Sequence, residues 1–555
     1  MLNSTREIYL NLFRYYYSLK HLGLINICRR IIFSHRRKSL NIIDASHATT
    51  LAESVKEHLL PQKELELCFY GKFHKFQLEN MLWKNQEFSE ELGKHWLEKL
   101  NSFEWINEEQ YKKLPVKLVS FLILDWITKH KNEHYPAWEP HTLSKRITAW
   151  VKWLNSNEVS PEVCSVLKPS ISIQLKRLYV DLELHCPSNH LLENLRGFLA
   201  GCTQMVCSSQ YFNNEIEYQL EDVTRETIKQ INKQFLSDGA YFERVPMLHI
   251  KMTEALGDIR EFAFNLSQKG FLLPRLIKKL KKLVKLCDTK TKEANGWLQF
   301  MTMQDGFIAQ FGDSARINGI KPDVTSKPQL LETSGYFINY NDNYSFILNC
   351  GEPAPTFQPG HNHSDILSYE LSINGSRSII DTGCSDFDNK TLRQMSRETE
   401  AHNLPMIQHQ NQSDIWGDYS FGKRAKVTKR CFEEATNKLE VEIEDQFSQR
   451  LTRTVAFSPK SIEISDKVQS KRMSGNFISM IHLAPGTEVE ICLSDEHPTL
   501  AQCQMTNGIK FSIITEGNLR IDDYLSFPEI GKAVSAKVLI LSNKDSEALS
   551  YAINW

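Results

Sequence analysis

The spacing of apolar residues changes near residue 300, and this change limits the folds that the chain can adopt. In residues 142–154, four apolar side chains beginning at Ile147 recur at i, i+3, i+4 and i+7, which predicts an amphipathic helix. In residues 438–445, apolar and acidic residues alternate, which predicts a half-buried strand. Helices that precede strands favour an α domain followed by an antiparallel β domain over alternating βαβ units.

Glycine is distributed in the same way. Only nine of the 24 glycines lie in residues 1–300, and none lies between Gly93 and Gly197. A glycine inside a helix costs ~1 kcal/mol relative to alanine, so this gap favours packed helices. Because 555 residues exceed the ~250–300 at which a single core stops growing, we expect several domains. The predicted division is an N-terminal leader or helical extension in 1–50, a helical domain in 51–300 and a β domain in 301–555.

Charge and hydropathy exclude several classes of protein. The net charge is −1, so no global field draws the chain onto nucleic acid. No apolar run reaches the ~18 residues of a transmembrane segment, and Arg6 and Arg14 interrupt the apolar start, so there is no clear signal peptide. The 12 cysteines form no CxxC pair, which favours free thiols over a disulfide framework. We therefore expect a soluble, cytoplasmic protein without a nucleic-acid partner.

The densest group of chemically active side chains lies early in the predicted β domain. His361 and His363 are separated by one residue, so on an extended chain they point the same way and suit two ligands of one ion, or one ligand beside a catalytic base. His363, Asp381 and His402 offer two imidazoles and a carboxylate, which suits Zn²⁺. The HxHxD run also resembles the start of the metallo-β-lactamase signature, but Ile366 stands where that family needs a histidine. Histidines that are hydrogen-bonded in the core are the alternative interpretation.

A second group lies in the predicted helical domain. Asn189 and His190 begin a helix rich in small residues, and Tyr241, Glu243 and Arg244 follow in the segment DGAYFERVPMLH. Such side chains can neutralise a substrate carboxylate and move a proton beside it. Helix caps and buried ion pairs explain the same residues equally well.

Taken together, several segments resemble the heparinase II/III family of polysaccharide lyases. The specific ones are QDGFIAQFGDSA (304–315) and the run from PGHNHSDILSYEL (359–371) through IIDTG to SRETEAHN (396–403), because order and spacing both agree. The other points of resemblance are EPHTLSKRITAWVKW (139–153), NHLLENLRGFLAG (189–201), DGAYFERVPMLH (238–249) and NQSDIWGDYSFGKRAKV (411–427).

The resemblance implies an α+β multidomain protein, with an N-terminal incomplete (α/α) toroid followed by a C-terminal antiparallel β-sandwich domain. It also implies β-elimination on an anionic, uronic-acid-containing polysaccharide. In that reaction a base removes the proton beside the uronate carboxylate, and an acid protonates the leaving glycosidic oxygen.

The resemblance also implies roles for individual residues. Asn189 with His190 would neutralise the carboxylate, and His361 would act as the base or as a proton shuttle. A largely structural Zn²⁺ would be bound by His363, Asp381 and His402. The candidates for contacts with the polymer are Glu243, Arg244, Arg393, Arg397 and Trp416.

Two departures from the family pattern concern the proton acid. The family usually carries a tyrosine immediately before the histidine of the ERVPMLH segment, where this chain has Leu248, and another tyrosine near Phe387. Neither replacement can transfer a proton, and Tyr241 is the candidate substitute. The alternative functions are therefore a non-catalytic glycan-binding or polysaccharide-assembly protein and a metallohydrolase that uses the HNHSD run.

The segment FRYYYSLKHLGLINICRRI also looks like the leader of family members that accompany bacterial surface-polysaccharide synthesis. It suggests a link to a capsule or another cell-envelope polymer. This link makes the periplasm or cell envelope the alternative to a cytoplasmic location.

Overall fold

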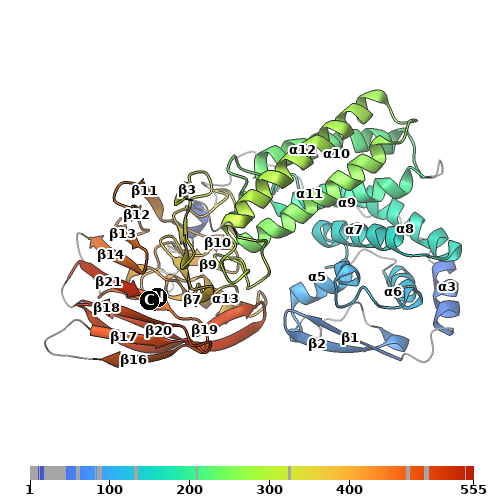
Figure 1. The fold of residues 1–555 in the computed structure, drawn as a ribbon. Coiled ribbons are helices and arrows are strands. Elements are labelled where there is room, and N and C mark those ends of the chain that lie inside the picture. The colour runs from blue at the N-terminus through green and yellow to red at the C-terminus, as the bar shows by residue number, and fades with distance from the viewer. Residues whose placement is uncertain are drawn as a thin grey trace. The chain divides into compact units, whose positions relative to one another are not determined.

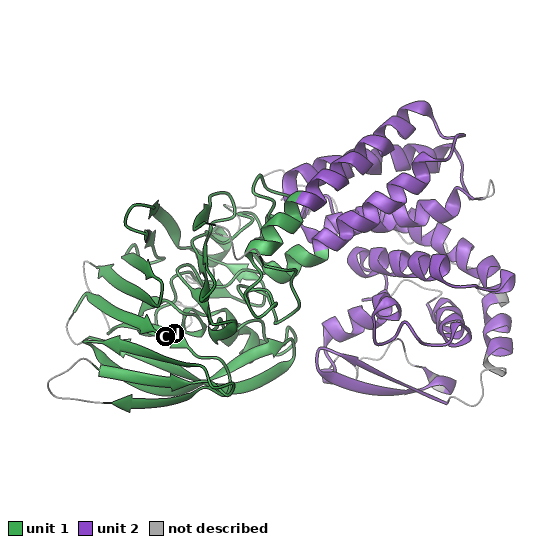
Figure 2. Ribbon diagram, viewed as in Figure 1, with its two compact units in different colours: residues 1–23, 235–251, 293–555 green, residues 24–234, 252–292 purple. Residues whose placement is uncertain are grey.

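The computed structural model describes most of the chain (Figure 1). The described residues are 11, 13–17, 20, 46–57, 63–81, 83, 90–130, 135–207, 211–322, 327–470, 476–492, 499–543 and 546–555. Most of the predicted leader in 1–50 therefore lies outside the described residues. The chain forms two compact units (Figure 2): residues 1–23, 235–251 and 293–555 make unit 1, and residues 24–234 and 252–292 make unit 2.

Unit 2 is built mainly from helices, as the apolar spacing predicts. The helix expected over 142–154 is α7 (Pro140–Ser156), and its residues Ile147 and Trp150 are fully buried. Gly197 of α9 (Asn189–Met205) allows α9 to approach α7 closely, because a Cβ there would lie 2.5 Å from the Ser144 carbonyl oxygen. The other α-helices with residues in this unit are α3 (Ser46–Glu57), α5 (Lys94–Ser102), α6 (Val116–Lys129), α8 (Pro161–Val180), α10 (Asn214–Gln234), α11 (Pro246–Ser267) and α12 (Pro274–Phe300), the last two contributing residues to both units.

A hairpin interrupts the region that we expect to be helical throughout. Strands β1 (Glu64–Phe69) and β2 (Lys72–Gln77) pair antiparallel. Alternate residues of β1, such as Leu67, are buried, and both turn residues, Tyr70 and Gly71, have positive φ, as a tight hairpin turn requires. The prediction of helix here is therefore wrong, because a short alternating run was overlooked among strong helical signals.

Unit 1 contains three larger antiparallel sheets. The eight-stranded sheet has the order β11 (Lys426–Glu433), β12 (Lys438–Glu444), β13 (Arg450–Ser458), β14 (Ser461–Gln469), β21 (Ala548–Asn554), β18 (Lys510–Thr515), β17 (Thr499–Gln504) and β16 (Glu488–Cys492). The five-stranded sheet runs β3 (Gln329–Leu331), β4 (Tyr336–Tyr340), β5 (Tyr344–Asn349), β6 (Tyr369–Ile373) and β7 (Ser376–Ile379). The four-stranded sheet runs β19 (Asn518–Glu529), β20 (Lys532–Ser542), β15 (Phe477–His482) and β8 (Pro405–Ile407).

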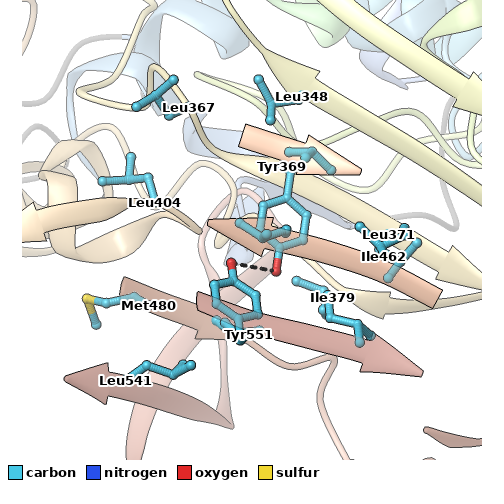
Figure 3. Packing of buried hydrophobic residues seen from close by; sticks show 14 of the residues in the cluster. Leu348, Leu367, Tyr369, Leu371, Ile379, Leu404, Ile462, Met480, Leu541 and Tyr551 are labelled. Carbon is cyan, nitrogen blue, oxygen red and sulfur yellow. Dashed lines mark hydrogen bonds between the residues drawn. The ribbon is translucent and has the colours of Figure 1, made fainter. Parts of the chain in front are cut away.

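The alternating run predicted over 438–445 is strand β12, whose Leu439, Val441 and Ile443 are fully buried. These residues belong to one core that contains side chains from all three sheets. Figure 3 shows part of this core, where the hydroxyl groups of Tyr369 and Tyr551 lie 3.4 Å apart. The prediction of a helical region followed by an antiparallel β domain is confirmed. No helix among the described residues is long and apolar enough to cross a membrane.

Candidate active site

A buried aspartate brings together several side chains of the His361 region. The Asp313 carboxylate lies 2.9 Å from His361 Nδ1 through one oxygen and 2.9 Å from His363 Nε2 through the other. Arg393 completes the group, donating from Nη2 to Oδ2 at 2.8 Å and from Nη1 to Oδ1. Three cationic or proton-donating groups therefore converge on one carboxylate that is only 1% exposed.

The local backbone explains why Asp313 lies beside the histidines. Gly312 has φ 58°, and its position leaves no room for a side chain, because a Cβ would lie 2.8 Å from the His361 carbonyl oxygen. The Asp313 amide donates to that same oxygen at 2.9 Å. The Asp313 loop is thereby held against the histidine segment by its main chain as well as by its carboxylate.

The charges in this group keep Asp313 ionised and orient the two histidines. Burial alone raises the pKa of Asp313, but Arg393 and the two histidines hold it well below its usual range. Burial lowers the pKa of His363 to about 4, so that ring is neutral near pH 7. An ionised carboxylate only accepts hydrogen bonds, so His361 donates to it from Nδ1 and its Nε2 takes no part in that contact.

His361 is the member of this group that meets solvent. Its side chain is 26% exposed, whereas that of His363 is 0% exposed. The Nε2 atom of His361 lies 4.0 Å from Oε2 of Glu243, whose residue is 1% exposed. This arrangement can accept a proton at Nε2 and stabilise the resulting imidazolium between two carboxylates.

The three predicted zinc ligands lie close to one another in the core. His402 donates from Nδ1 to the Asp381 carboxylate at 2.9 Å and 3.0 Å, and its ring centroid lies 5.4 Å from that of His363. The Nδ1 atom of His363 and the Nε2 atom of His402 are buried without a hydrogen-bond partner. As the side chains stand, no three His, Cys, Asp or Glu residues of the described chain are grouped to hold a metal ion.

The two predicted substrate-binding arginines are buried. Arg393 is 1% exposed and binds Asp313, and Arg397 is 0% exposed. Arg397 donates from Nη1 to the carbonyl oxygens of Gly417 and Asp418 at 3.0 Å each, and burial lowers its pKa to about 9. Both arginines come from α13 (Lys390–Arg397), which Asn389 caps by accepting from the Leu392 amide. They therefore position carboxylate and loop groups inside the protein and do not face a polymer.

That loop presents a tyrosine that the sequence analysis does not identify. The ring centroid of Tyr419 lies 6.0 Å from that of His361, and Cζ of Arg393 lies 5.2 Å from the Tyr419 centroid. Tyr419 is only partly buried. The candidate acid Tyr241 is instead 0% exposed and packs against Phe235, with ring centroids 5.5 Å apart. Its burial argues against direct contact with a polymer.

The other predicted residues of unit 1 lie around this group. Arg244 lines a polar cavity, which is described below. Trp416 is half-buried in strand β9 (Ile415–Trp416), which pairs with β10 (Ser420–Phe421), and its ring lies edge-on to Tyr15 with a centroid distance of 5.4 Å. Beside Tyr15, Arg14 forms an ion pair with Asp414 at 2.9 Å.

In unit 2, Asn189 and His190 open helix α9. The His190 ring stacks on His141 with centroids 3.9 Å apart, and its Nδ1 lies 3.2 Å from Oε1 of Glu183. Desolvation lowers the pKa of His190, but the Glu183 carboxylate raises it by more, so the net shift is upward. The His190 side chain is 40% exposed, so its imidazole reaches solvent beside the buried Asn189.

Sequence reasoning missed Asp313 and Tyr419 as functional residues. The family resemblance could have pointed to both residues. Asp313 lies in the segment 304–315 and Tyr419 in the segment 411–427, and both segments carry the resemblance. Neither segment has a local pattern that reveals which distant residue it meets. The hydrogen bonds of Asp313 span 48 to 80 residues of chain.

Comparisons with known proteins show which family model the β region matches and which solved structures have a similar fold. Residues 323–555 match the family model described as heparinase II/III-like, C-terminal. No curated protein sequence matches the chain. The crystal structure of heparinase III matches with a TM-score of 0.65 and 16% identity, over 94% of this chain and 88% of that chain. Heparan sulfate lyase HepC from Pedobacter heparinus matches with a TM-score of 0.56 and 15% identity, over 91% and 82%. These structures share the predicted fold of a helical toroid followed by a β-sheet domain.

Proposed function

We propose that this chain, whose residues 323–555 match the heparinase II/III-like C-terminal family model and whose fold resembles that of heparinase III, cleaves a uronic-acid-containing polysaccharide by β-elimination. The observation that carries the proposal is the state of His361. Its Nδ1 is hydrogen-bonded to the ionised Asp313, its Nε2 makes no contact with that carboxylate, and its side chain is 26% exposed. A histidine held in this way is a suitable base for a weakly acidic C–H proton.

We assign the steps as follows. Nε2 of His361 takes the proton from the carbon beside the uronate carboxylate. The released electron pair forms a carbon–carbon double bond while the adjacent bond to the glycosidic oxygen breaks. Tyr419 donates its phenolic proton to that leaving oxygen, and the proton on His361 then restores the phenol, so no water is consumed. Glu243, 4.0 Å from Nε2, stabilises the imidazolium between these steps.

The carboxylate of the substrate needs its own partners, because its charge increases as the proton leaves. We propose that Asn189 and His190 supply them, as the family resemblance implies. The raised pKa of His190 supports this role, since it favours the cationic form of the ring. Arg393 and Arg397 act as positioning residues for Asp313 and for the loop that carries Tyr419.

The test is incubation of the purified protein with a panel of uronic-acid polymers while the ultraviolet absorbance of the conjugated, unsaturated product is followed. Product formation that disappears in His361→Ala supports the lyase. Full activity in His361→Ala contradicts the role of His361. Product without unsaturation, together with loss of activity on chelation, identifies a metallohydrolase.

A non-catalytic glycan-binding protein is the second candidate. It is favoured by Leu248 and Phe387, which stand where the family usually carries tyrosines, and by the complete burial of Tyr241. Tight binding of a polymer by wild type without any cleavage across the panel would establish it. A link to bacterial surface polysaccharide in the cell envelope is proposed from the leader alone, and most of that leader lies outside the described residues. Capsule- or envelope-derived polymers therefore belong in the panel.

We also propose a structural Zn²⁺ held by His363, Asp381 and His402. The support is the donor set and the two buried ring nitrogens without partners. Such an ion would hold together the segments that carry these three residues. Elemental analysis of protein purified without chelator should give one zinc per chain, lost in His363→Ala and kept in the control His409→Ala, whose side chain is 77% exposed. If wild-type protein purified in this way contains no zinc, the proposed metal site is wrong.

A further inference from the structure

A polar cavity in unit 1 contains two arginines that are not assigned to the reaction centre. The cavity has a volume of about 390 Å³. Its lining consists of Arg244, Glu332, Thr333, Cys350, Glu352, Val427, Thr428, Lys429 and Arg430. Its rim is open to solvent, because the side chains of Glu332 and Lys429 are 72% and 51% exposed.

The hydrogen bonds that anchor the two guanidinium groups go to backbone carbonyl oxygens. Arg244 donates from Nη1 to the Glu352 carbonyl oxygen at 2.9 Å, and Arg430 donates from Nη1 to that of Glu332 at 3.2 Å. The nearest carboxylate contact of Arg430 is with the exposed Glu332 side chain, at 3.9 Å. A carbonyl oxygen fixes a guanidinium group without cancelling its charge, although Glu332 and Glu352 in the lining offset part of the positive charge.

The remaining charged groups of the lining already have partners. Oε1 of Glu352 accepts from the Val427 amide at 3.1 Å, and Lys429 pairs with Glu440 at 2.7 Å. The Nε atom of Arg244 is buried and has no hydrogen-bond partner. A buried N–H group without an acceptor costs free energy, and a bound ligand that accepts its hydrogen bond would remove this cost.

Two glycines make room for the guanidinium groups. A Cβ on Gly351 would lie 3.1 Å from Arg244 Nη1, and a Cβ on Gly335 would lie 3.1 Å from Arg430 Nη1. The same Gly335 Cβ would lie 2.5 Å from Gly351 Cα, so the two backbone segments also touch each other. Both guanidinium groups therefore lie directly against the contact between Gly335 and Gly351, where a side chain would displace them.

The backbone of Arg244 is itself held in an uncommon conformation. Its φ is 61°, in the left-handed region that a bulky side chain rarely adopts. The Tyr336 hydroxyl donates to the Arg244 carbonyl oxygen at 2.7 Å, and the Arg244 amide donates to the Tyr241 carbonyl oxygen at 2.9 Å. Strain of this kind persists where the surroundings fix it, and it is concentrated at ligand-binding positions.

We propose that this cavity is an oxyanion subsite, in which Arg244 and Arg430 bind a carboxylate or sulfate group of the polysaccharide. Guanidinium groups suit such anions because they donate two parallel hydrogen bonds. The subsite adjoins the reaction centre through the chain, since Arg244 follows Glu243, whose carboxylate lies 4.0 Å from His361 Nε2. The inference rests on the proposed function for the identity of its ligand.

The experiment is isothermal titration calorimetry on the full chain carrying His361→Ala, which blocks turnover. The probes are inorganic sulfate, an unsulfated oligouronate and a sulfated uronic-acid oligosaccharide. Arg430→Gln should weaken binding of at least one probe about tenfold or more, because it removes a charged hydrogen-bond donor. The matched control is Arg450→Gln, an exposed arginine of the same sheet, which should change affinity less than twofold.

The three probes separate the sources of the anion. A tenfold loss for the sulfated probe alone assigns the subsite to a sulfate ester, and a loss for both oligosaccharides assigns it to the uronate carboxylate. Equal affinities of Arg430→Gln and its parent for all three probes overturn the subsite. Arg430 is on strand β11 at the edge of its sheet, and Arg430→Lys, which keeps the charge, should retain part of the affinity.

The failure of this inference can be told from the failure of the proposed function. If the otherwise wild-type chain never gives an unsaturated product but Arg430→Gln still weakens binding, the subsite stands and the lyase does not. If the product forms at equal kcat/KM in wild type and Arg430→Gln, the lyase stands and the subsite is wrong.

Discussion

Asp313 shows how one residue can set the chemistry of several others. Its carboxylate is ionised because Arg393 lies against it, and the ionised carboxylate in turn accepts a hydrogen bond from Nδ1 of His361. His363 meets the same carboxylate but is fully buried, so it cannot serve as a second base. Of the two histidines in the HxH pair, only His361 is therefore partly exposed to solvent.

The identity of the proton acid can be tested at single residues. We expect Tyr419→Phe to lower kcat by about 100-fold or more with KM nearly unchanged, because the phenol acts only when the leaving oxygen needs a proton. Tyr241→Phe should keep most of the activity, since Tyr241 is 0% exposed. Initial rates with the polymer that wild type cleaves are the measurement. Full activity in Tyr419→Phe, or loss confined to Tyr241→Phe, would contradict the assignment.

His249 makes the stability of the protein depend on pH. It is fully buried, its Nδ1 accepts from the Tyr241 amide at 2.9 Å, and its Nε2 lies 3.0 Å from the Ala294 carbonyl oxygen. The neutral ring satisfies both contacts, whereas a protonated ring would oppose a donor to the Tyr241 amide. Burial accordingly lowers the pKa of His249 to about 4, despite the opposing effect of the Ala294 hydrogen bond.

The sign of the pH effect follows from this shift. Below about pH 6.5 the unfolded chain binds a proton at this histidine that the folded chain does not bind, so the free energy of unfolding falls as pH decreases from about 6.5 to about 4. The loss from His249 amounts to about 3 kcal/mol. Urea denaturation across this range should show a shallower pH dependence in His249→Gln than in wild type. Identical pH dependence in the two proteins would refute the linkage.

At the scale of elements, the sequence patterns predict what is local and periodic. Helix α7 and strand β12 follow directly from their apolar spacing, because each buries one face against its neighbours. The β1–β2 hairpin was missed since its six-residue strands are short beside the surrounding helices. Burial of Tyr241 could not be predicted either, because its motif position says nothing about how tightly Phe235 and Phe242 pack around it.

The contact between α7 and α9 gives a prediction for these elements. Gly197→Ala should reduce the free energy of unfolding by about 1–3 kcal/mol, because its Cβ would overlap the Ser144 backbone unless the helices move apart. Gly257→Ala in α11 is the matched control, since nothing lies within 4 Å of its Cβ position, and it should stabilise by about 0.5–1 kcal/mol. Chemical denaturation of both variants measures the difference. Equal effects would show that the close approach of the helices is unimportant.

At the scale of the whole molecule, the arrangement of the candidate site depends on contacts between residues that are far apart in sequence. Asp313 lies on a loop before β3, His361 follows β5, and Arg393 lies on α13. The family resemblance covers the segments that carry these residues, but it assigns no role to Asp313. For this reason the histidines could be named from the sequence and the carboxylate that orients them could not.

A buried ion pair connects the β core to the histidine segments. Arg453 and Asp466 are both 0% exposed, and Arg453 donates from Nε and Nη2 to the two carboxylate oxygens at 2.7 Å each. Its Nη1 donates to the carbonyl oxygens of Leu367 and Asn403, at 2.8 Å and 2.6 Å. Leu367 and Asn403 follow His363 and His402 closely in the chain, so the ion pair helps to fix the backbone beside both histidines.

This pair should behave as a unit when it is mutated. Arg453→Met should lower the free energy of unfolding by about 3–5 kcal/mol, because it leaves a buried carboxylate without its partner. The double variant Arg453→Met, Asp466→Leu should recover much of that loss, since no buried charge remains, although the two carbonyl groups stay unpaired. The exposed pair of Lys537 and Asp523 is the control, and Lys537→Met should cost at most about 1 kcal/mol. A double-mutant cycle by urea denaturation tests this expectation, and additive losses at positions 453 and 466 would contradict it.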